Sequence, residues 1–502
     1  MRSPSSFAVL AALVLSLTLG CSPAHITTPS QPGLPTASAT SPLLQLQHDI
    51  DGILGQPALA HGYWSVLVRS LKTDDTLYSV NANKLMVPAS NMKIVTLAAA
   101  AEKLGWDYRY ETQLVATGSI VSGTLDGDLV VVGSGDPTLM ITAATARPFD
   151  AWAAEVKRLG ISRITGRVVG DGTAFDSPGF GFGWSWDDLP DSDAAAVAGL
   201  QFNENAVRMI VTPGRSADEP TVITLDPPTS GLSVRNHVQT GAPGSTVHLE
   251  SHRLPGNTQL EVRGSVPPGE APAMRLVAVD NPTLFFASAL RQALIDNGVN
   301  VLEPAVDIAA LSDDPMHHAR TSIATFRSAP LSEIAVRLMK VSQNLYAETL
   351  LMTMSEGRPA TAAAGLAGVQ AVLTPWGVSE GLILRDGSGL TRYDYVTSEA
   401  LVRILTHVDR DPRLRDPFEA SLPVAGRDGT LANRMKGTAA EGNARGKTGS
   451  LSNVRALSGF VATTDREPLV FSIVANNFDT GADVVNKATD AIVIRLATFK
   501  RQ

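Results

Sequence analysis

Cysteine is almost absent from this chain, because Cys21 is the only one among 502 residues. A single cysteine excludes an internal disulfide, so the fold depends on its core without covalent cross-links. The chain has only 9 histidines and no His-Glu-x-x-His pattern. His317 and His318 are adjacent, and their side chains point apart unless the backbone bends there. We therefore expect no metal site and no cofactor.

Excess positive charge is also missing. The chain has 41 Lys and Arg against 49 Asp and Glu, for a net charge of −8, and no basic stripe appears. This balance argues against nucleic acid as a partner. Beyond the N-terminus no apolar run reaches the length of about 18 residues that a membrane span needs. The 44% of hydrophobic residues is nevertheless enough for large cores, and the length suggests about three domains.

The N-terminus has the pattern of an export signal. Arg2 is followed by the apolar run FAVLAALVLSLTLG and then by Cys21. We assign residues 1–21 to a signal peptide, residues 22–42 to a flexible Pro/Ser/Thr/Ala-rich linker, and the protein to the periplasm or cell envelope.

The sequence LTLGC resembles the lipobox of bacterial lipoproteins, in which the cysteine is lipidated. A lipid on Cys21 would tether the protein to a membrane. Thr18 stands where a leucine is usual, and ordinary cleavage after Ala24 would instead release a soluble protein.

The rest of the chain reads as one mixed α/β domain with an insertion. A helical pattern and two strands precede residue 106, and helices and strands return towards the C-terminus. Between them, residues 106–275 hold short strands separated by Gly, Pro, Asp and Asn, which predicts an all-β insertion of one or two domains. Residues 43–105 and 276–502 would then form the domain that the insertion interrupts.

Ser90 and Lys93 form the only Ser-x-x-Lys in the chain, at the start of an alanine-rich apolar helix. Residues three apart share a helix face, so the lysine can reach the serine hydroxyl. A lysine with a lowered pKa can take the proton of a serine and make it a nucleophile. The N–H groups of the first turn can stabilise an oxyanion there. Alone, the pair is more simply a helix cap followed by a solvated lysine.

Two further motifs support a catalytic site. Ser342 and Asn344 lie where two helical patterns meet, and they can pass protons and hold a substrate carbonyl. Lys447, Thr448 and Gly449 open a strand. The lysine supplies a second cation, the threonine can bind a carboxylate, and the glycine lets a substrate backbone approach. A strand edge also suits pairing with an extended peptide. Each motif alone would be read as a cap or a strand start.

The ordered trio resembles the penicillin-binding-protein and serine β-lactamase superfamily. Within it, the chain is similar to the D-alanyl-D-alanine carboxypeptidase/endopeptidase family of the penicillin-binding protein 4 type, serine peptidase family S13. A long β-rich segment between the first two motifs is typical of this type. The residues that carry the likeness lie in VPASNMK, GDLVVVGSGDPTL, LQFNENAV, VSQNLYAETLL, RDGSGLTRYD, LPVAGRDGTL and ARGKTGSLSNVRALSGF.

The resemblance implies a serine β-lactamase/DD-peptidase-like fold, with an antiparallel sheet flanked by helices. It implies that Ser90 is the acylated nucleophile, Lys93 its general base and Ser342 the relay to the leaving amine. The residues implied to bind substrate, or to contribute an N–H group to the oxyanion hole, are Asn344, Lys447, Thr448, Gly449 and Ser450.

The substrates implied are peptidoglycan stem peptides, with cleavage of D-Ala-D-Ala ends, of cross-links, or of both. β-Lactams are expected as covalent inhibitors. Two alternatives remain open: a β-lactamase or esterase on the same scaffold, and a non-catalytic protein that binds β-lactams or the cell wall.

Two other segments have simpler interpretations. DGSGL, residues 386–390, offers an exposed serine between glycines, but a structural turn beside the site is the better reading. The tryptophans of GWSWDDL, residues 183–189, either line a glycan groove or anchor an inserted domain, and we favour the second.

Overall fold

The computed structural model describes residues 41–142, 147–176, 179–317 and 319–501. The predicted signal peptide, nearly all of the predicted linker and Cys21 lie outside the described residues, as does His318. Within the described ranges, the helices are too short or too polar to cross a membrane.

A five-stranded sheet brings the two ends of the chain together. Its strands lie in the order β18 (Arg445–Leu451), β19 (Val454–Ala462), β20 (Pro468–Asn476), β1 (Tyr63–Ser70) and β2 (Thr76–Val80), and neighbours are antiparallel. Strand β20 is buried at every position after Pro468. A strand buried on both sides must have both faces of its sheet covered.

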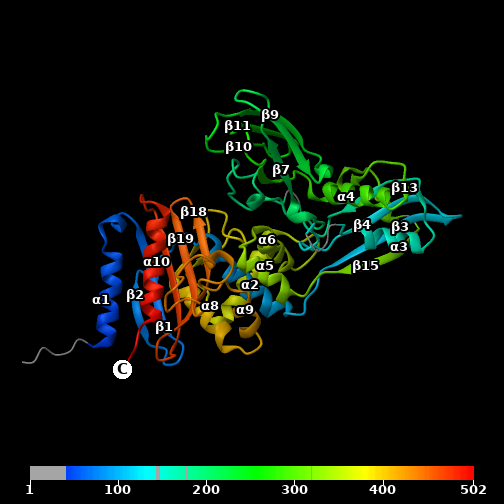
Figure 1. Cartoon of the computed structure of the whole chain (residues 1–502). Coiled ribbons are helices and arrows are strands. Elements are labelled where there is room, and N and C mark those ends of the chain that lie inside the picture. The colour runs from blue at the N-terminus through cyan, green and yellow to red at the C-terminus, as the bar shows by residue number, and fades with distance from the viewer. Residues whose placement is uncertain (1–40, 143–146, 177–178, 318, 502) are drawn as a thin grey trace, which may run out of the picture. The chain divides into compact units, whose positions relative to one another are not determined.

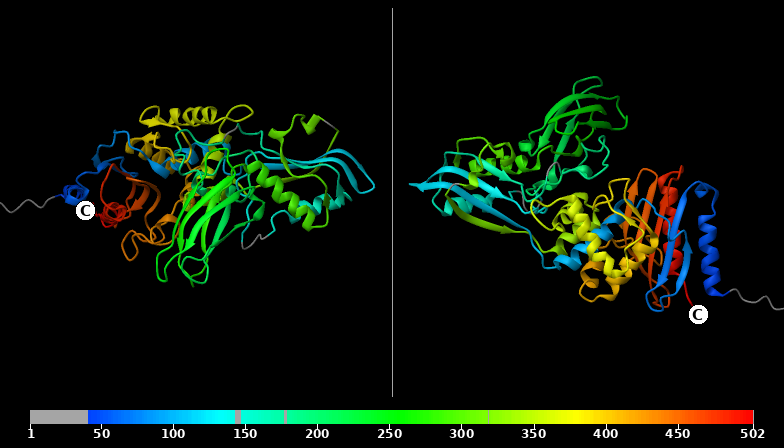
Figure 2. Two further views of the ribbon diagram at one scale, coloured as in Figure 1. Left: turned by 90° about the horizontal axis from the view of Figure 1, so that it is seen from above. Right: turned by 180° about the vertical axis from the view of Figure 1, so that it is seen from behind.

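Helices cover the two faces. Helices α1 (Pro42–Leu54) and α10 (Ala482–Ala497) lie side by side on one face, and α2 (Met92–Leu104) and α8 (Ser398–Arg410) lie on the other (Figures 1 and 2). Alternate side chains of β20 reach the two cores: Phe471 packs with α1 and α10, and Val470 with α2 and α8. This arrangement confirms the predicted fold class.

Helix α2 is buried almost all round, as a central helix of a core must be. Its alanine-rich middle lets three helices approach closely: α6 (Asn344–Thr353), α7 (Ala362–Leu373) and α8. Helix α5 (Leu331–Lys340) packs against the same core. The N-terminal end of α2 is thereby held rigidly beside the start of α6.

The segment between α2 and α5 forms further sheets. One contains β13 (Asn300–Val301), β5 (Arg163–Ile164), β4 (Thr124–Val132), β3 (Glu111–Val121), β15 (Arg320–Arg327), β6 (Val168–Asp171) and β14 (Val306–Asp307). A second has the order β10 (His248–His252), β11 (Gln259–Val266) and β9 (Ser233–Thr240). A third has the order β12 (Ala273–Ala278), β7 (Ala206–Thr212) and β8 (Val222–Asp226).

Two findings differ from the sequence interpretation. The insertion is not all β, because helix α3 (Asp150–Arg158) packs in its core through Trp152. Helix α4 (Pro282–Asp296) lies beyond the predicted boundary at residue 275, yet it packs with the inserted strands, and β15 pairs with β3. A periodic pattern reveals an amphipathic helix but not the core it joins. The boundaries 106–275 and 276–502 stay a prediction.

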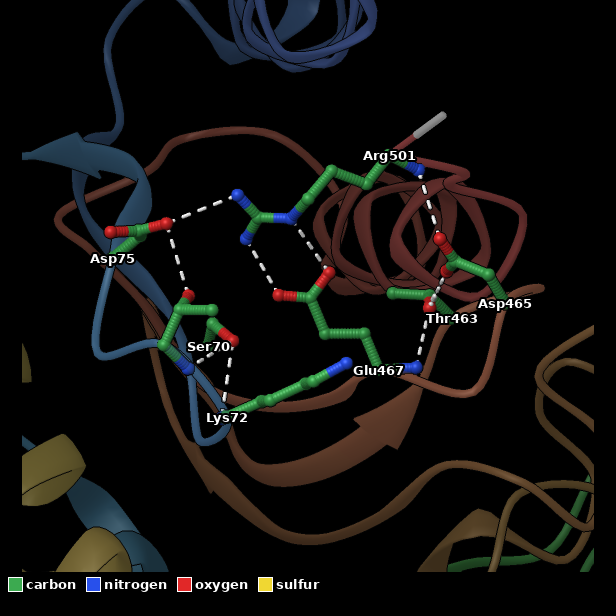
Figure 3. A network of polar contacts seen from close by, with 8 residues as sticks. Ser70, Lys72, Asp75, Thr463, Asp465, Glu467 and Arg501 are labelled. Atoms are coloured by element: carbon green, nitrogen blue, oxygen red, sulfur yellow. Dashed lines mark hydrogen bonds and ion pairs between the residues drawn. The ribbon is translucent and has the colours of Figure 1, made fainter.

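The C-terminal residues are fastened to the five-stranded sheet by Arg501 (Figure 3). Its guanidinium donates Nε to Glu467 Oε2 at 2.9 Å and Nη2 to Glu467 Oε1 at 2.6 Å, and Nη1 reaches Asp75 Oδ2 at 3.1 Å. Because Glu467 is only 6% exposed, this two-point contact is better shielded from water than an ordinary surface ion pair.

Candidate active site

Ser90 and Lys93 face one another at the start of the central helix. Ser90 lies in a short 3₁₀ turn, η2 (Ala89–Asn91), directly before α2, and Lys93 lies in the first turn of α2. The Lys93 Nζ and Ser90 Oγ atoms are 2.9 Å apart. Asn91 ties this turn to the sheet by donating Nδ2 to the Lys447 carbonyl at 2.9 Å.

Lys93 is fully buried and has two other partners. Its Nζ donates to Asn344 Oδ1 at 2.6 Å and to the Ser388 carbonyl at 2.9 Å. Burial lowers the pKa of Lys93 to about 8, although the carboxylates of Asp386, Glu348 and Asp193 oppose this shift. A lysine with such a pKa is partly neutral near physiological pH.

Ser342 and Lys447 form a second pair beside the first. Lys447 Nζ donates to Ser342 Oγ at 2.8 Å and to the Thr448 carbonyl at 2.9 Å. Burial, followed by the charge of Lys93, holds the pKa of Lys447 well below its usual value. Ser342 links α5 and α6 with φ 66°, a left-handed conformation that is costly for serine and is typical of functional sites.

Strand β18 forms an edge of the five-stranded sheet beside the serines. Thr448 Oγ1 donates to Thr430 Oγ1 at 2.7 Å. A Cβ at Gly449 would lie 2.6 Å from the Pro88 carbonyl oxygen, so only glycine fits there. Ser450, the next residue, is exposed. Part of this edge is already occupied within the protein, because the Gly446 N–H donates to the Pro423 carbonyl and the Thr448 carbonyl accepts from Lys447 Nζ.

A cavity of about 650 Å³ opens over this cluster. Its lining includes Ser90, Ser342, Asn344, Thr448 and Ser450. Thus the structure brings the predicted residues of all three motifs to one cleft, with Lys93 and Lys447 buried beneath it.

The insertion supplies one wall of the cleft. Four acidic residues lie there: Asp187, Asp188, Asp191 and Asp193. The Asp193 carbonyl also accepts a hydrogen bond from Asn344 Nδ2 at 2.8 Å. Both ends of the Asn344 carboxamide are therefore fixed, one by Lys93 and one by the insertion.

Sequence reasoning missed three participants in this geometry. Ser388 was expected to be exposed; it is buried, and its carbonyl contacts Lys93. Thr430 and Asp193 were not singled out, although Thr430 belongs to a quoted motif, LPVAGRDGTL. Of the tryptophans, Trp184 donates Nε1 to Asp386 Oδ2 at 3.0 Å, whereas Trp186 is 59% exposed.

Potential metal ligands gather away from the cleft. In the part of the chain that the structure describes, the candidate group is Glu102, His407 and Asp411. The guanidinium of Arg413 donates to Glu102 at 3.1 Å and to Asp411 at 2.6 Å, so a cation already balances these carboxylates.

The fold and the serine–lysine cluster define a serine hydrolase of the DD-peptidase class, and comparison with known proteins identifies the family. The D-Ala-D-Ala carboxypeptidase 3 (S13) family matches residues 46–499. The chain belongs to this family. It is a serine-type D-Ala-D-Ala carboxypeptidase, a hydrolase whose substrates are peptidoglycan peptides of the cell envelope.

Individual relatives agree with this assignment. A D-alanyl-D-alanine carboxypeptidase of Actinomadura sp. (strain R39) is 37% identical over 484 residues, covering 94% of this chain and 87% of that protein. The D-alanyl-D-alanine carboxypeptidase DacB of Haemophilus influenzae is 27% identical over 439 residues, covering 86% and 88%. The crystal structure of penicillin binding protein 4 (dacB) from H. influenzae has a TM-score of 0.78 at 26% identity, covering 90% of this chain and 99% of that one.

Gly389 offers a test of how tightly the serine turn is held. A Cβ at Gly389, whose φ is +80°, would lie 1.8 Å from the Ala89 carbonyl oxygen, beside Ser90. We expect Gly389→Ala to slow acylation of the enzyme by a fluorescent penicillin about 100-fold, the effect of misplacing a reacting group by about 1 Å.

Gly437→Ala is the matched control for Gly389→Ala. Gly437 has a similar φ of +71° but open space around its Cβ position. Equal acylation rates in the two variants would show that backbone strain, and not displacement of the serine turn, is the whole effect.

Proposed function

We propose that Ser90 attacks the carbonyl carbon of the penultimate D-Ala of a stem peptide. The Oγ–C bond forms, the C–N bond to the terminal D-Ala breaks, and water later releases the shortened peptide from Ser90. The observation that carries this proposal is the environment of Lys93, which is buried, has a lowered pKa and touches the Ser90 hydroxyl.

The partners of Lys93 favour a role as general base. A neutral amine has two N–H groups and one lone pair. The Asn344 Oδ1 and Ser388 carbonyl oxygens accept the two N–H groups, which leaves the lone pair towards Ser90 Oγ. Lys93 can therefore accept the serine proton as the Oγ–C bond forms.

The remaining motif residues suit the leaving group and the developing charge. Ser342 Oγ, which accepts a hydrogen bond from Lys447, would carry the proton from Lys93 to the departing amine. The Thr448 hydroxyl and the Lys447 N–H groups suit the terminal carboxylate of the substrate as hydrogen-bond donors. The N–H groups of Ser90 and Ser450 would form the oxyanion hole. These roles are the ones that the S13 family implies.

The pKa of Lys93 sets the expected pH dependence. At pH values below its pKa of about 8, Lys93 is mostly protonated and cannot accept a proton. The second-order rate constant for acylation should therefore rise about tenfold per pH unit up to pH 8 and then level off. Stopped-flow labelling with a fluorescent penicillin between pH 5.5 and 9.5 measures this, and a flat profile would contradict a lysine base.

Peptide products identify the bond cleaved. We expect incubation with a pentapeptide muropeptide to release one alanine, which mass spectrometry detects as the loss of one residue. Splitting of a cross-linked dimer would add endopeptidase activity. Stable penicillin adducts without any change in either muropeptide would instead favour a β-lactam-binding protein without peptidase activity.

We propose that β-lactams acylate Ser90, because their strained amide mimics the D-Ala-D-Ala amide bond that the enzyme cleaves. The H. influenzae penicillin binding protein 4 has a structure complexed with a novel β-lactam. Adducts lasting hours indicate a penicillin-binding enzyme, whereas turnover within seconds would indicate a β-lactamase.

We also propose export to the periplasm and lipidation of Cys21, on the basis of the LTLGC sequence. The mass of the mature N-terminus distinguishes a lipidated Cys21 from a chain cut after Ala24.

A further inference from the structure

Glu348 is a buried carboxylate to which the chemistry above gives no task. It lies on α6 one helical turn after Asn344, and so on the same helix face. It is only 5% exposed. Burying an acid is costly unless partners compensate it, and its contacts show what those partners are.

The Glu348 carboxylate holds the turn that follows Asp386. Its Oε1 atom accepts the N–H groups of Gly387 at 3.0 Å and Ser388 at 2.7 Å, and its Oε2 atom accepts Gly387 N–H at 3.1 Å. The Ser388 carbonyl, in the same turn, accepts from Lys93 Nζ. One residue thus connects the Glu348 carboxylate to the proposed base.

The other side of this turn is also fixed. Asp386 Oδ1 accepts the Gly389 N–H at 2.6 Å, and its Oδ2 atom accepts the Thr391 N–H at 2.7 Å. The Gly387 carbonyl accepts from Thr96 Oγ1 at 2.7 Å. The direction of the Ser388 carbonyl is therefore set by buried hydrogen bonds and not by solvent.

We propose that Glu348 is a positioning residue for the reaction: it aims the Ser388 carbonyl at Lys93, so that the lysine lone pair points to Ser90. This inference rests on the proposed role of Lys93 as base. Without a fixed Ser388 carbonyl the amine would rotate about its Cε–Nζ bond, and the lone pair would face Ser90 for only part of the time.

Charge contributes as well as geometry. The charged groups that face Lys93 are Asp386, Glu348, Asp193 and Lys447. The three carboxylates raise the pKa of Lys93 against the effect of burial. Burial and the neighbouring Asp386 raise the pKa of Glu348 itself, whereas its hydrogen bonds from the Gly387 and Ser388 N–H groups oppose this shift and favour the carboxylate. Removing the Glu348 carboxylate therefore lowers the pKa of Lys93.

Glu348→Gln separates positioning from a structural role. Glutamine keeps the volume but loses the charge, and its NH₂ group replaces the oxygen that accepts the second contact from the Gly387 N–H. We expect the plateau of the acylation rate above pH 8 to fall about 10- to 100-fold, by analogy with the loss when a group that orients a metal ligand is removed. The acid limb, which is the part of the pH profile where the rate rises up to pH 8, should move to lower pH. The kcat should fall, while the KM for a D-Ala-D-Ala peptide should stay close to the wild-type value.

Two variants complete the experiment. Glu348→Asp keeps the charge on a shorter side chain, and we expect an intermediate plateau with the limb unmoved. Glu333→Gln removes an exposed carboxylate from α5 and should behave as wild type. If Glu348→Gln unfolds more easily than the wild type, Glu348→Asp becomes the deciding variant. The proposal then requires that the plateau of its acylation rate falls.

A wild-type plateau and limb in both Glu348 variants would overturn the positioning role. If Glu348→Gln instead slows acylation equally at all pH values without moving the acid limb, that outcome would show that Glu348 has only a structural role. Failure of the proposed function looks different, because Lys93→Met would then retain the rate and pH profile of the wild type.

Discussion

Replacing Ser90 by alanine should abolish covalent labelling by a fluorescent penicillin and lower the kcat for D-Ala release by at least about 10⁴-fold, as loss of a nucleophile does in other serine enzymes. The Ser90 Oγ atom forms the covalent bond to the penicillin. Lys93, whose Nζ atom lies 2.9 Å away, does not replace it as a nucleophile, because Lys93 is fully buried. Gel fluorescence and intact mass measure the adduct, and alanine release measures turnover.

Ser379→Ala is the control for this experiment, because Ser379 is exposed and lies outside the cleft. It should label and turn over as wild type does. Thermal unfolding of Ser90→Ala should match the wild type, since a partly buried hydroxyl is replaced by a smaller group. A stoichiometric penicillin adduct on Ser90→Ala would show that another residue is acylated and would refute the mechanism.

Replacing Lys93 by methionine should slow acylation by about 10²- to 10⁴-fold, the range that a general base contributes. The pH limb near 8 should disappear with it, because the group that titrates is gone. The folded protein should be less stable than the wild type, because methionine leaves the buried Asn344 Oδ1 and Ser388 carbonyl oxygens without their donor. Acylation kinetics across pH, with thermal unfolding, test all three expectations.

Lys103→Met provides the matched control on the same helix, because Lys103 reaches the surface, where it pairs with Glu356. It should leave the rate and the pH profile unchanged. If Lys93→Met keeps a limb near pH 8, the proton acceptor is a different group, and the second buried lysine of the cleft, Lys447, becomes the first candidate.

Each sequence motif fixes the local geometry of its own residues. Ser90 and Lys93 share a helix face by spacing alone. That residues of the three motifs would meet around Ser90 followed from the family resemblance and not from periodicity, since nothing local relates residues so far apart. The 2.8 Å contact between Lys447 and Ser342 was not predicted, and the catalytic roles remain predictions.

Backbone partners were the part that sequence patterns could not give. The Ser388 and Asp193 carbonyls act through atoms that every residue type carries, so their identity leaves no signature. The expectation that Ser388 is exposed was wrong. A Gly-Ser-Gly sequence suggests a surface turn, but the Glu348 and Asp386 carboxylates accept the Ser388 N–H inside the protein. Likewise, the pattern of α4 showed a helix but not its neighbours.

The bond between Asn344 and the Asp193 carbonyl bears on how this enzyme could be minimised for engineering. A deletion that joined α2 to α5 through a short loop would preserve all three signature motifs and every strand of the five-stranded sheet. It would nevertheless strip the carboxamide of its second anchor and remove the indole that braces Asp386. Such a compact derivative would contain all three motifs and still turn over substrate slowly, because the insertion helps to hold the active-site residues in place.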